Sequence, residues 1–155
     1  MKVYIAAHYS KKEEVKQAVR DLDDLGIEVT STWHNEKDNP HSHLTDNGRQ
    51  TNQYRAIRDL AELKAATHLV FFSIGLKKCF TRGGHCYENG AGDILGLKTI
   101  VVGERQHIFH HLPGYRIVPT WEKAMVWLKK EKKLDEYATI KSKPNWRDYD
   151  NDNSY

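Results

Sequence analysis

Residues 82–92, Arg-Gly-Gly-His-Cys-Tyr-Glu-Asn-Gly-Ala-Gly, combine residue types that can do chemistry. Gly83 and Gly84 lead into a predicted helix, which places Glu88 near the first turn of that helix. A carboxylate at a helix N-terminus, beside a loop whose backbone can approach a ligand closely, is a common arrangement for an active-site acid or nucleophile. A glycine turn followed by a capping glutamate gives the same pattern, so this stretch alone leaves both interpretations open.

A second carboxylate, that of Asp59, is expected at the same edge of the structure. Asp59 falls in a predicted helix before the strand at 68–73, and Glu88 opens the helix after that strand. Two carboxylates suit chemistry at a glycosidic carbon, because its transition state resembles an oxocarbenium ion, and in retaining enzymes they lie ~5 Å apart. Ordinary i,i+4 surface pairs among the charged residues of 55–62 are the alternative interpretation.

Apolar runs alternate with helical patterns along the chain. We expect strands over 2–7, 27–33, 68–73, 99–102 and 115–118. We expect helices over 10–26, 51–65, 85–95 and 121–128, the first opened by a Ser10–Glu13 capping box and the last capped by Thr120. The polar stretch 34–48 shows no period and is expected to be a long loop.

This alternation predicts an α/β fold with a parallel sheet buried on both faces. Five strands joined by right-handed crossovers suggest the order 2-1-3-4-5, in a flavodoxin-like or Rossmann-like three-layer sandwich. Ligands in such folds bind beyond the carboxyl ends of the strands. We expect a single α/β domain over 1–133, followed by a polar C-terminal tail or arm over 134–155.

Composition narrows the function classes. Of the 155 residues 29% are charged, and no apolar run approaches the ~20 residues of a membrane span, so no membrane partner is expected. The formal net charge of +3 is too small to argue for nucleic acid, and the basic cluster at 129–133 is typical of a solvated helix end. Two cysteines without paired spacing, and a first strand that starts almost at Met1 without a leader, predict a cytoplasmic protein.

Several motifs occur in the order and spacing of a known family. They are Val3–Ala7, Thr30–Trp33, Arg58–Leu60 and Arg82–Gly90, followed by the stretches 101–113 and 119–121. Together they resemble the nucleoside 2-deoxyribosyltransferase family, and the closing stretches are similar to its small phage and bacterial members. The resemblance covers roughly residues 1–128.

The resemblance implies an enzyme that cleaves the N-glycosidic bond of 2'-deoxynucleosides or of their 5'-monophosphates. The sugar is then transferred to another base or to water. Glu88 matches the family nucleophile, Asp59 the acid beside the sugar and base, and Tyr4 the tyrosine whose hydroxyl supports the nucleophile. The resemblance also implies a homo-oligomer, a dimer or larger, in which a neighbour's side chain completes each pocket. No cofactor is expected.

Further residues at the predicted carboxyl edge are candidates for substrate binding. Ser10, Lys11, Lys12 and the free N–H groups of the first helix could hold a 5'-phosphate, although the lysines could equally be solvated. Trp33 could stack on a base or cap the core. The complete set of predicted substrate-binding residues is Ala7, His8, Ser10, Trp33, Arg82, Gly84 and His85.

The sequence also bears on three other kinds of site: a non-catalytic nucleotide site, a metal site and a dinucleotide site. His68 and Asn89 depart from the family pattern, which makes a non-catalytic nucleotide-binding or sensing module of the same fold the alternative. The histidines of 34–43 and 107–111 lack the paired spacing of a zinc site, so no metal is expected. No GxGxxG follows the first strand, which argues against a dinucleotide site. The expected partner is therefore a small nucleoside or nucleotide.

Overall fold

The computed structural model describes residues 1–37, 46–75 and 83–141, which form a five-stranded sheet with helices on both faces. The strands are β1 (Lys2–Ala7), β2 (Glu28–Val29), β3 (His68–Phe72), β4 (Lys98–Val102) and β5 (Arg116–Val118). All neighbouring strands pair in parallel, and their order is β2-β1-β3-β4-β5. The predicted fold class and strand order are thus confirmed.

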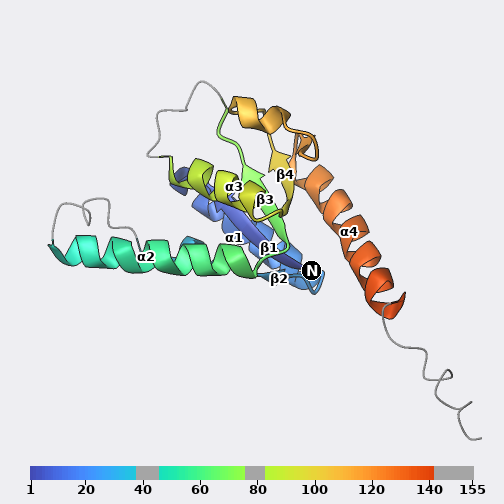
Figure 1. The fold of residues 1–155 in the computed structure, drawn as a ribbon, viewed down its shortest axis with the longest axis horizontal. Helices are drawn as coiled ribbons and strands as arrows, with labels where there is room; N and C mark the ends of the chain where they lie inside the picture. Colours follow the sequence, from blue (N-terminus) through green and yellow to red (C-terminus); the bar gives the residue numbers. More distant parts are fainter. Residues whose placement is uncertain (38–45, 76–82, 142–155) are drawn as a thin grey trace, which may run out of the picture.

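The helices make the two outer layers of a sandwich. They are α1 (Lys12–Asp24), α2 (Asp46–Ala65), α3 (Gly84–Ile94) and α4 (Trp121–Lys141), with short 3-10 helices η1 (Tyr9–Lys11), η2 (Trp33–Asn35) and η5 (Ile108–His111). Figure 1 shows α3 in front of the strands and α1 behind them. The indole N–H of Trp121 donates to Asp21, 2.7 Å away, which joins α4 to α1 on one face. The other face is covered by α2 and α3, which contact each other.

Side chains of the central strands alternate between these two layers, as the pleat requires. On β3, the ring of Phe71 stacks on His85 of α3, with centroids 5.4 Å apart. Its neighbour Phe72 points the other way, against Trp121 of α4. All five residues of β3 are buried, which is the pattern of a parallel strand covered on both sides.

The start of the first helix differs from the prediction, so the capping-box interpretation is wrong. Ser10 lies within η1, and α1 begins only at Lys12. The ring of His8 supplies the cap instead, because its Nδ1 accepts a hydrogen bond from the backbone N–H of Ser10. This cap serves η1, and the hydroxyl of Ser10 lies 2.8 Å from the same Nδ1, while α1 begins after Lys11 without a side-chain cap.

The second strand is much shorter than the predicted 27–33. Only Glu28 and Val29 pair with β1 in the ladder. The backbone N–H of Thr30 still donates to the carbonyl of Val3. Beyond it side chains replace backbone pairing: the N–H of Ile5 donates to the hydroxyl of Ser31, and the indole N–H of Trp33 donates to the carbonyl of Ile5. These bonds satisfy the β1 backbone while the chain turns into η2.

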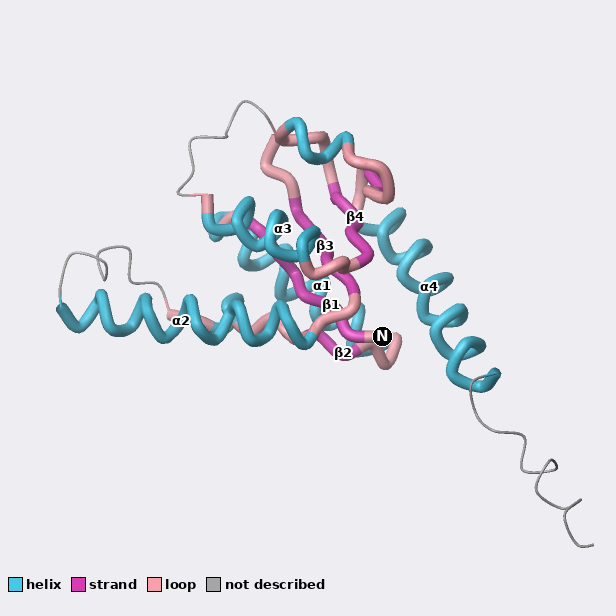
Figure 2. The backbone as a smooth tube through the Cα atoms, viewed as in Figure 1, coloured by secondary structure: helices cyan, strands magenta, loops and turns pink. Residues whose placement is uncertain are grey.

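Two helices extend beyond the apolar periodicity used to predict them. α2 begins at Asp46 rather than near 51, and α4 runs to Lys141 rather than ending near 128. Figure 2 shows that the second half of α4 points away from the sheet. A helix with solvent on most sides needs no apolar stripe, and pairs such as Lys132–Glu136 support it. Residues 134–141, which belong to the segment expected to be a polar tail or arm, are helical.

Helix α3 lies close to the sheet because Gly92 has no side chain. A Cβ at this position would lie 3.0 Å from Cδ2 of Leu69 on β3. Gly90, on the same helix, has no neighbour within 4 Å of such an atom. The two glycines are therefore a matched pair for testing how closely α3 packs on β3.

We predict opposite packing consequences for alanine at these positions. Gly90→Ala should raise the free energy of unfolding by about 0.5–1 kcal/mol, because alanine loses less backbone entropy on folding. Gly92→Ala gains the same backbone benefit but forces Leu69 to move, so it should be at least about 1 kcal/mol less stable than Gly90→Ala. Urea unfolding of both variants measures this, and equal stabilities would contradict the packing argument.

Candidate active site

A hydrogen bond between β1 and α3 joins two of the predicted site residues. The hydroxyl of Tyr4 donates to Oε1 of Glu88 over 2.8 Å. Tyr4 is fully buried in the middle of β1, beside Leu69 of β3. The strand therefore fixes the phenol rigidly, and the phenol fixes one oxygen of the carboxylate.

The start of α3 explains the position of Glu88. Gly83 precedes the helix in the left-handed region, with φ of 76°, where glycine avoids the strain of a side chain. The helix then turns His85, Asn89 and Gly92 inward at helical spacing. Glu88 follows His85 by three residues and lies on the same side of the helix, so it faces Tyr4 in the middle of β1.

Burial dominates the electrostatics of Glu88. Desolvation raises the pKa of Glu88 to about 8, and the negative charges of Asp59 and Glu62 add to this effect. The hydrogen bond from Tyr4 and the charge of Arg58 act in the opposite direction and lower the pKa. Burial and the nearby carboxylates also raise the pKa of Tyr4, so its hydroxyl keeps its proton and remains the donor.

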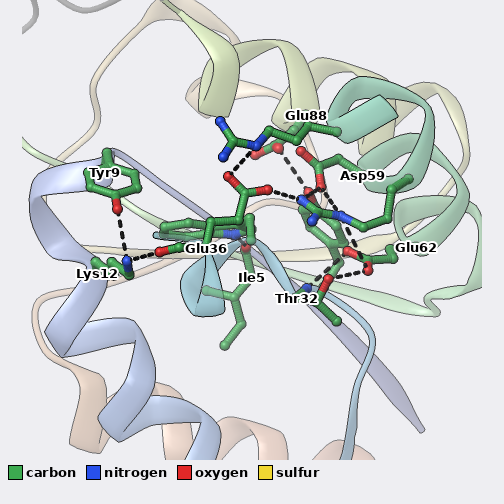
Figure 3. A network of polar contacts seen from close by, with 12 residues as sticks. Ile5, Tyr9, Lys12, Thr32, Glu36, Asp59, Glu62 and Glu88 are labelled. Atoms are coloured by element: carbon green, nitrogen blue, oxygen red, sulfur yellow. Dashed lines mark hydrogen bonds and ion pairs between the residues drawn. The ribbon is translucent and has the colours of Figure 1, made fainter. Parts of the chain in front are cut away.

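Asp59 lies beside Glu88 on the neighbouring helix, α2 (Figure 3). Its Oδ1 accepts two hydrogen bonds from Arg58, at 2.6 Å from Nη2 and 3.0 Å from Nε. Desolvation raises the pKa of Asp59, and the hydrogen bond and charge of Arg58 oppose that rise. Arg58 therefore opposes protonation of this carboxylate and orients it next to Glu88.

Two further acids enter the site from interactions that the sequence does not suggest. Glu36, just after η2, binds Arg58 and also Arg55, whose Nε lies 2.9 Å from its carboxylate. Glu62 accepts from the backbone N–H of Thr32 at 2.9 Å and from the hydroxyl of Thr32 at 2.5 Å. Figure 3 shows these groups as one continuous network. It ties the segment after β2 to α2.

The surface-pair interpretation of the charged segment 55–62 accounts for only part of its contacts. Arg58 does form an i,i+4 pair with Glu62, at 3.7 Å, as the surface-pair alternative expects. Its main contacts, however, are with Asp59 and with Glu36, which is 22 residues away along the chain. No sequence period links position 36 to position 58, so this contact could not be found before the fold was known.

The network brings more negative than positive groups together. Four carboxylates, two arginines and one phenol share the space between β1, η2, α2 and α3; they are Glu36, Asp59, Glu62, Glu88, Arg55, Arg58 and Tyr4. Such an environment stabilises a positively charged centre better than a negatively charged one. An oxocarbenium-like sugar is a centre of that kind.

The predicted substrate-binding residues of β1 and its turn lie beside α3. Ala7 is the last residue of β1, and the ring of His8 lies edge-on to that of His85, 5.9 Å between centroids. The hydroxyl of Ser10 is 2.8 Å from Nδ1 of His8. Gly84 is the first residue of α3. Arg82 falls outside the described residues.

The lysines proposed for phosphate binding have other partners. Lys11 pairs with the carboxylate of Glu14 at 2.7 Å. Lys12 donates to the hydroxyl of Tyr9 and to the carbonyl of Glu36. In this arrangement Lys12 supports the segment that carries Glu36.

Trp33 has the contacts of a core residue. Its side chain is 8% exposed, and its indole N–H donates to the carbonyl of Ile5 over 2.7 Å. One edge approaches the ring of Tyr9, 6.4 Å between centroids. Of the two interpretations offered by the sequence, capping the core fits these contacts.

The departures from the family pattern have packing partners. His68 lies at the amino end of β3 and contacts Trp127 of α4, on the opposite face from Glu88. Asn89 donates to the hydroxyl of Tyr115 over 3.2 Å.

Over the described ranges there is no group of three or more histidine, cysteine or acidic side chains that could hold a metal ion. Within the same ranges no helix is long and apolar enough to cross a membrane.

We predict that the buried carboxyl of Glu88 makes the fold less stable at alkaline pH. Its pKa is about 8 in the folded state against an ordinary 4.5, so the folded state holds the proton more tightly. Stability should therefore decline as pH rises from about 5 through 8, because ionisation then favours the unfolded chain. Glu88→Gln, which cannot ionise, should match the parent at about pH 5 and exceed its unfolding free energy by about 4 kcal/mol at about pH 9. Chemical denaturation at both pH values measures the difference, and a constant difference would refute the raised pKa.

Comparison with known proteins finds similar chains among solved structures only. No protein-family model and no curated protein matches the chain. Among solved structures, it is similar to a 2-deoxyribosyltransferase from Bacillus psychrosaccharolyticus, with 21% identity and a TM-score of 0.59, over 80% of this chain and 90% of that one. It is also similar to the CMP N-glycosidase BcmB of Clostridium botulinum, with 19% identity and a TM-score of 0.49, over 88% of this chain and 100% of that one. At this identity, the first likeness establishes a shared fold.

Proposed function

We propose that this protein cleaves the N-glycosidic bond of 2'-deoxynucleosides or their 5'-monophosphates, with Glu88 as the nucleophile. The observation that carries the proposal is the 2.8 Å hydrogen bond from Tyr4 to Glu88, inside a cluster of carboxylates beside the middle of β1. The motif resemblance supports it independently of the geometry. The fold shared with a 2-deoxyribosyltransferase is consistent with it.

The reaction has two displacements at the same sugar carbon. Ionised Glu88 attacks C1', the C1'–N bond breaks, and its electron pair leaves with the base. A glycosyl ester on Glu88 results. A nitrogen of a second base, or a water molecule that loses a proton, then attacks C1', and the ester C–O bond breaks to restore the carboxylate.

The surrounding residues have distinct parts in this scheme. Tyr4 holds Oε1 of Glu88, which leaves the other oxygen to attack. Asp59, oriented by Arg58, stabilises the positive charge that develops on the sugar. His8, Ser10, His85 and the backbone at Ala7 and Gly84 form the substrate-binding rim, with Arg82 assigned to it by the motif alone.

The resemblance extends the proposal to the assembly. A homo-oligomer, a dimer or larger, in which one copy completes the pocket of another, is proposed on that basis alone, and light scattering tests it. A cytoplasmic location is proposed from the two cysteines, whose spacing is not that of a paired motif.

Removing the nucleophile should abolish base release. We expect Glu88→Gln to lower turnover at least about 10³-fold, as loss of a covalent nucleophile does in other enzymes. Each deoxynucleoside and deoxynucleotide is incubated with and without a second free base, and the products are separated by chromatography. Glu28→Gln, an exposed partner of Lys2, is the matched control and should retain full turnover. Unchanged turnover in Glu88→Gln, or tight calorimetric binding of a nucleotide by the parent with no base released, would overturn the proposal.

Tyr4 should set the pH at which the enzyme becomes active. The acidic limb of the kcat/KM profile reflects ionisation of Glu88 in the free enzyme. Because the Tyr4 hydrogen bond lowers the pKa of Glu88, Tyr4→Phe should move this limb to higher pH. Each unit of movement lowers kcat/KM on the acidic limb about tenfold. Tyr137→Phe, at the exposed end of α4, is the control, and a limb that stays in place in Tyr4→Phe would contradict the assignment.

A further inference from the structure

We propose that Gln106 fixes His85 as the neutral tautomer with its proton on Nδ1, and that His85 donates this proton in a hydrogen bond to the departing base. The second half of this inference rests on the proposed function. The first half is a property of the folded protein alone. Gln106 is a positioning residue in this scheme, and His85 is the group that touches substrate.

The orientation of the Gln106 amide is determined by a backbone group. Gln106 is 3% exposed, between β4 and η5. Its Oε1 accepts from the N–H of Ile74 at 3.2 Å and from the hydroxyl of Ser73 at 3.4 Å. A backbone N–H can only donate, so the oxygen of the amide must face Ile74 and the NH₂ group must face the other way.

The oriented amide then determines the tautomer of His85. Nε2 of Gln106 lies 3.1 Å from Nε2 of His85. An amide NH₂ has no lone pair to offer, so the ring nitrogen must be the acceptor and carry no proton. The second amide hydrogen points to Sγ of Cys86, 3.7 Å away. A neutral His85 ring therefore carries its proton on Nδ1.

The surroundings of His85 keep the ring neutral. Burial, together with His8 and His107, lowers the pKa of His85 to about 4. The ring is stacked on Phe71 of β3 with an interplanar angle of 23°, and Cys86 and Gln106 face its Nε2 edge. No carboxylate is among the groups that shift this pKa, so nothing there favours the imidazolium.

The protonated nitrogen is free to meet a ligand near Glu88. His85 lies one helical turn before Glu88 on the inner side of α3, and its edge faces His8 at the end of β1. Among the described residues, no hydrogen bond engages Nδ1 of His85. Some ring nitrogens are fully buried and have no hydrogen-bond partner, and they belong to His34, His68, His107 and His110. Nδ1 of His85 is not one of them.

A neutral imidazole suits the leaving step of the proposed reaction. As the C1'–N bond breaks, its electron pair moves onto the base, and the oxygen or nitrogen acceptors of the base become more negative. The hydrogen bond from Nδ1 strengthens as this charge develops, and the proton stays on His85. A cationic histidine would instead oppose the positive charge that forms on the sugar at the same moment.

The same glutamine also provides an internal control, because it favours the opposite tautomer in a second histidine. Its backbone N–H donates to Nδ1 of His110 over 3.1 Å, so a neutral His110 must carry its proton on Nε2. His8 is also an Nε2–H tautomer, because its Nδ1 accepts from the backbone N–H of Ser10. His85 should therefore differ from both of these histidines.

Nitrogen-15 NMR of histidine-labelled, ligand-free protein at about pH 7 tests the tautomer, with signals assigned by loss in His85→Asn. We expect a protonated Nδ1 for His85 and a protonated Nε2 for His110. Gln106→Glu should place a proton on Nε2 of His85, in the Nε2–H tautomer or in the imidazolium, because both carboxylate oxygens are acceptors. Gln106→Met, of similar volume, should leave a tautomer mixture. A protonated Nε2 in the parent, or an Nδ1–H tautomer that persists in both variants, would overturn the first half.

Kinetics test the second half separately. Gln106→Glu should lower kcat for base release on the order of 10²-fold, the cost of losing one donor aimed at developing charge, with a smaller change in KM. An unchanged kcat in a variant whose tautomer has switched would overturn the donor role. Because NMR needs no turnover, a failure of the Glu88 reaction leaves the tautomer result standing, and a wrong tautomer leaves the Glu88 reaction standing.

Discussion

The site depends on holding a carboxylate where water solvates it poorly. Glu88 is removed from solvent by the packing of α3 on β1 and β3, and this burial is the largest contribution to its raised pKa. Among the residues that the structure describes, the phenol of Tyr4 is the one side chain that donates a hydrogen bond to it. A carboxylate so weakly solvated is a stronger nucleophile once ionised, because little hydration must be shed before attack. The same burial makes ionisation costly for the fold.

The guanidinium of Arg58 moderates that cost without neutralising the site. It binds Asp59 and Glu36 directly and acts on Glu88 only at a distance. Two hydrogen bonds from Arg58 to the same oxygen of Asp59 suit this role, since they fix the orientation of the acid as well as compensating its charge. The region therefore keeps an excess of negative charge and a fixed geometry. Both favour a transition state in which positive charge appears on the substrate.

The sequence predicts the sheet far better than it predicts the contacts around the site. Continuous apolar runs and alternating helical periods suffice for the strand order, because parallel sheets impose both. The Tyr4–Glu88 pair could be expected from motifs on β1 and α3. The Glu36–Arg58 contact and the Gln106–His85 contact join loop segments to helices, and loop positions carry no period from which such a pairing can be read. The extension of α4 could not be predicted for a related reason, because its added turns carry charge pairs such as Lys132–Glu136, which leave no apolar pattern.

The shortness of the outer strands has a consequence for how the protein behaves among its own copies. β2 pairs through two residues and β5 is three residues long, while the long central strands are covered on both sides. A sheet edge with so few unpaired backbone groups gives an incoming strand from another molecule little to bind. Ser31 and Trp33 bind the backbone of β1 through their side chains, where a longer β2 would pair through its backbone. Keeping β2 short in this way limits aggregation through strand addition, and it also turns the chain toward the site.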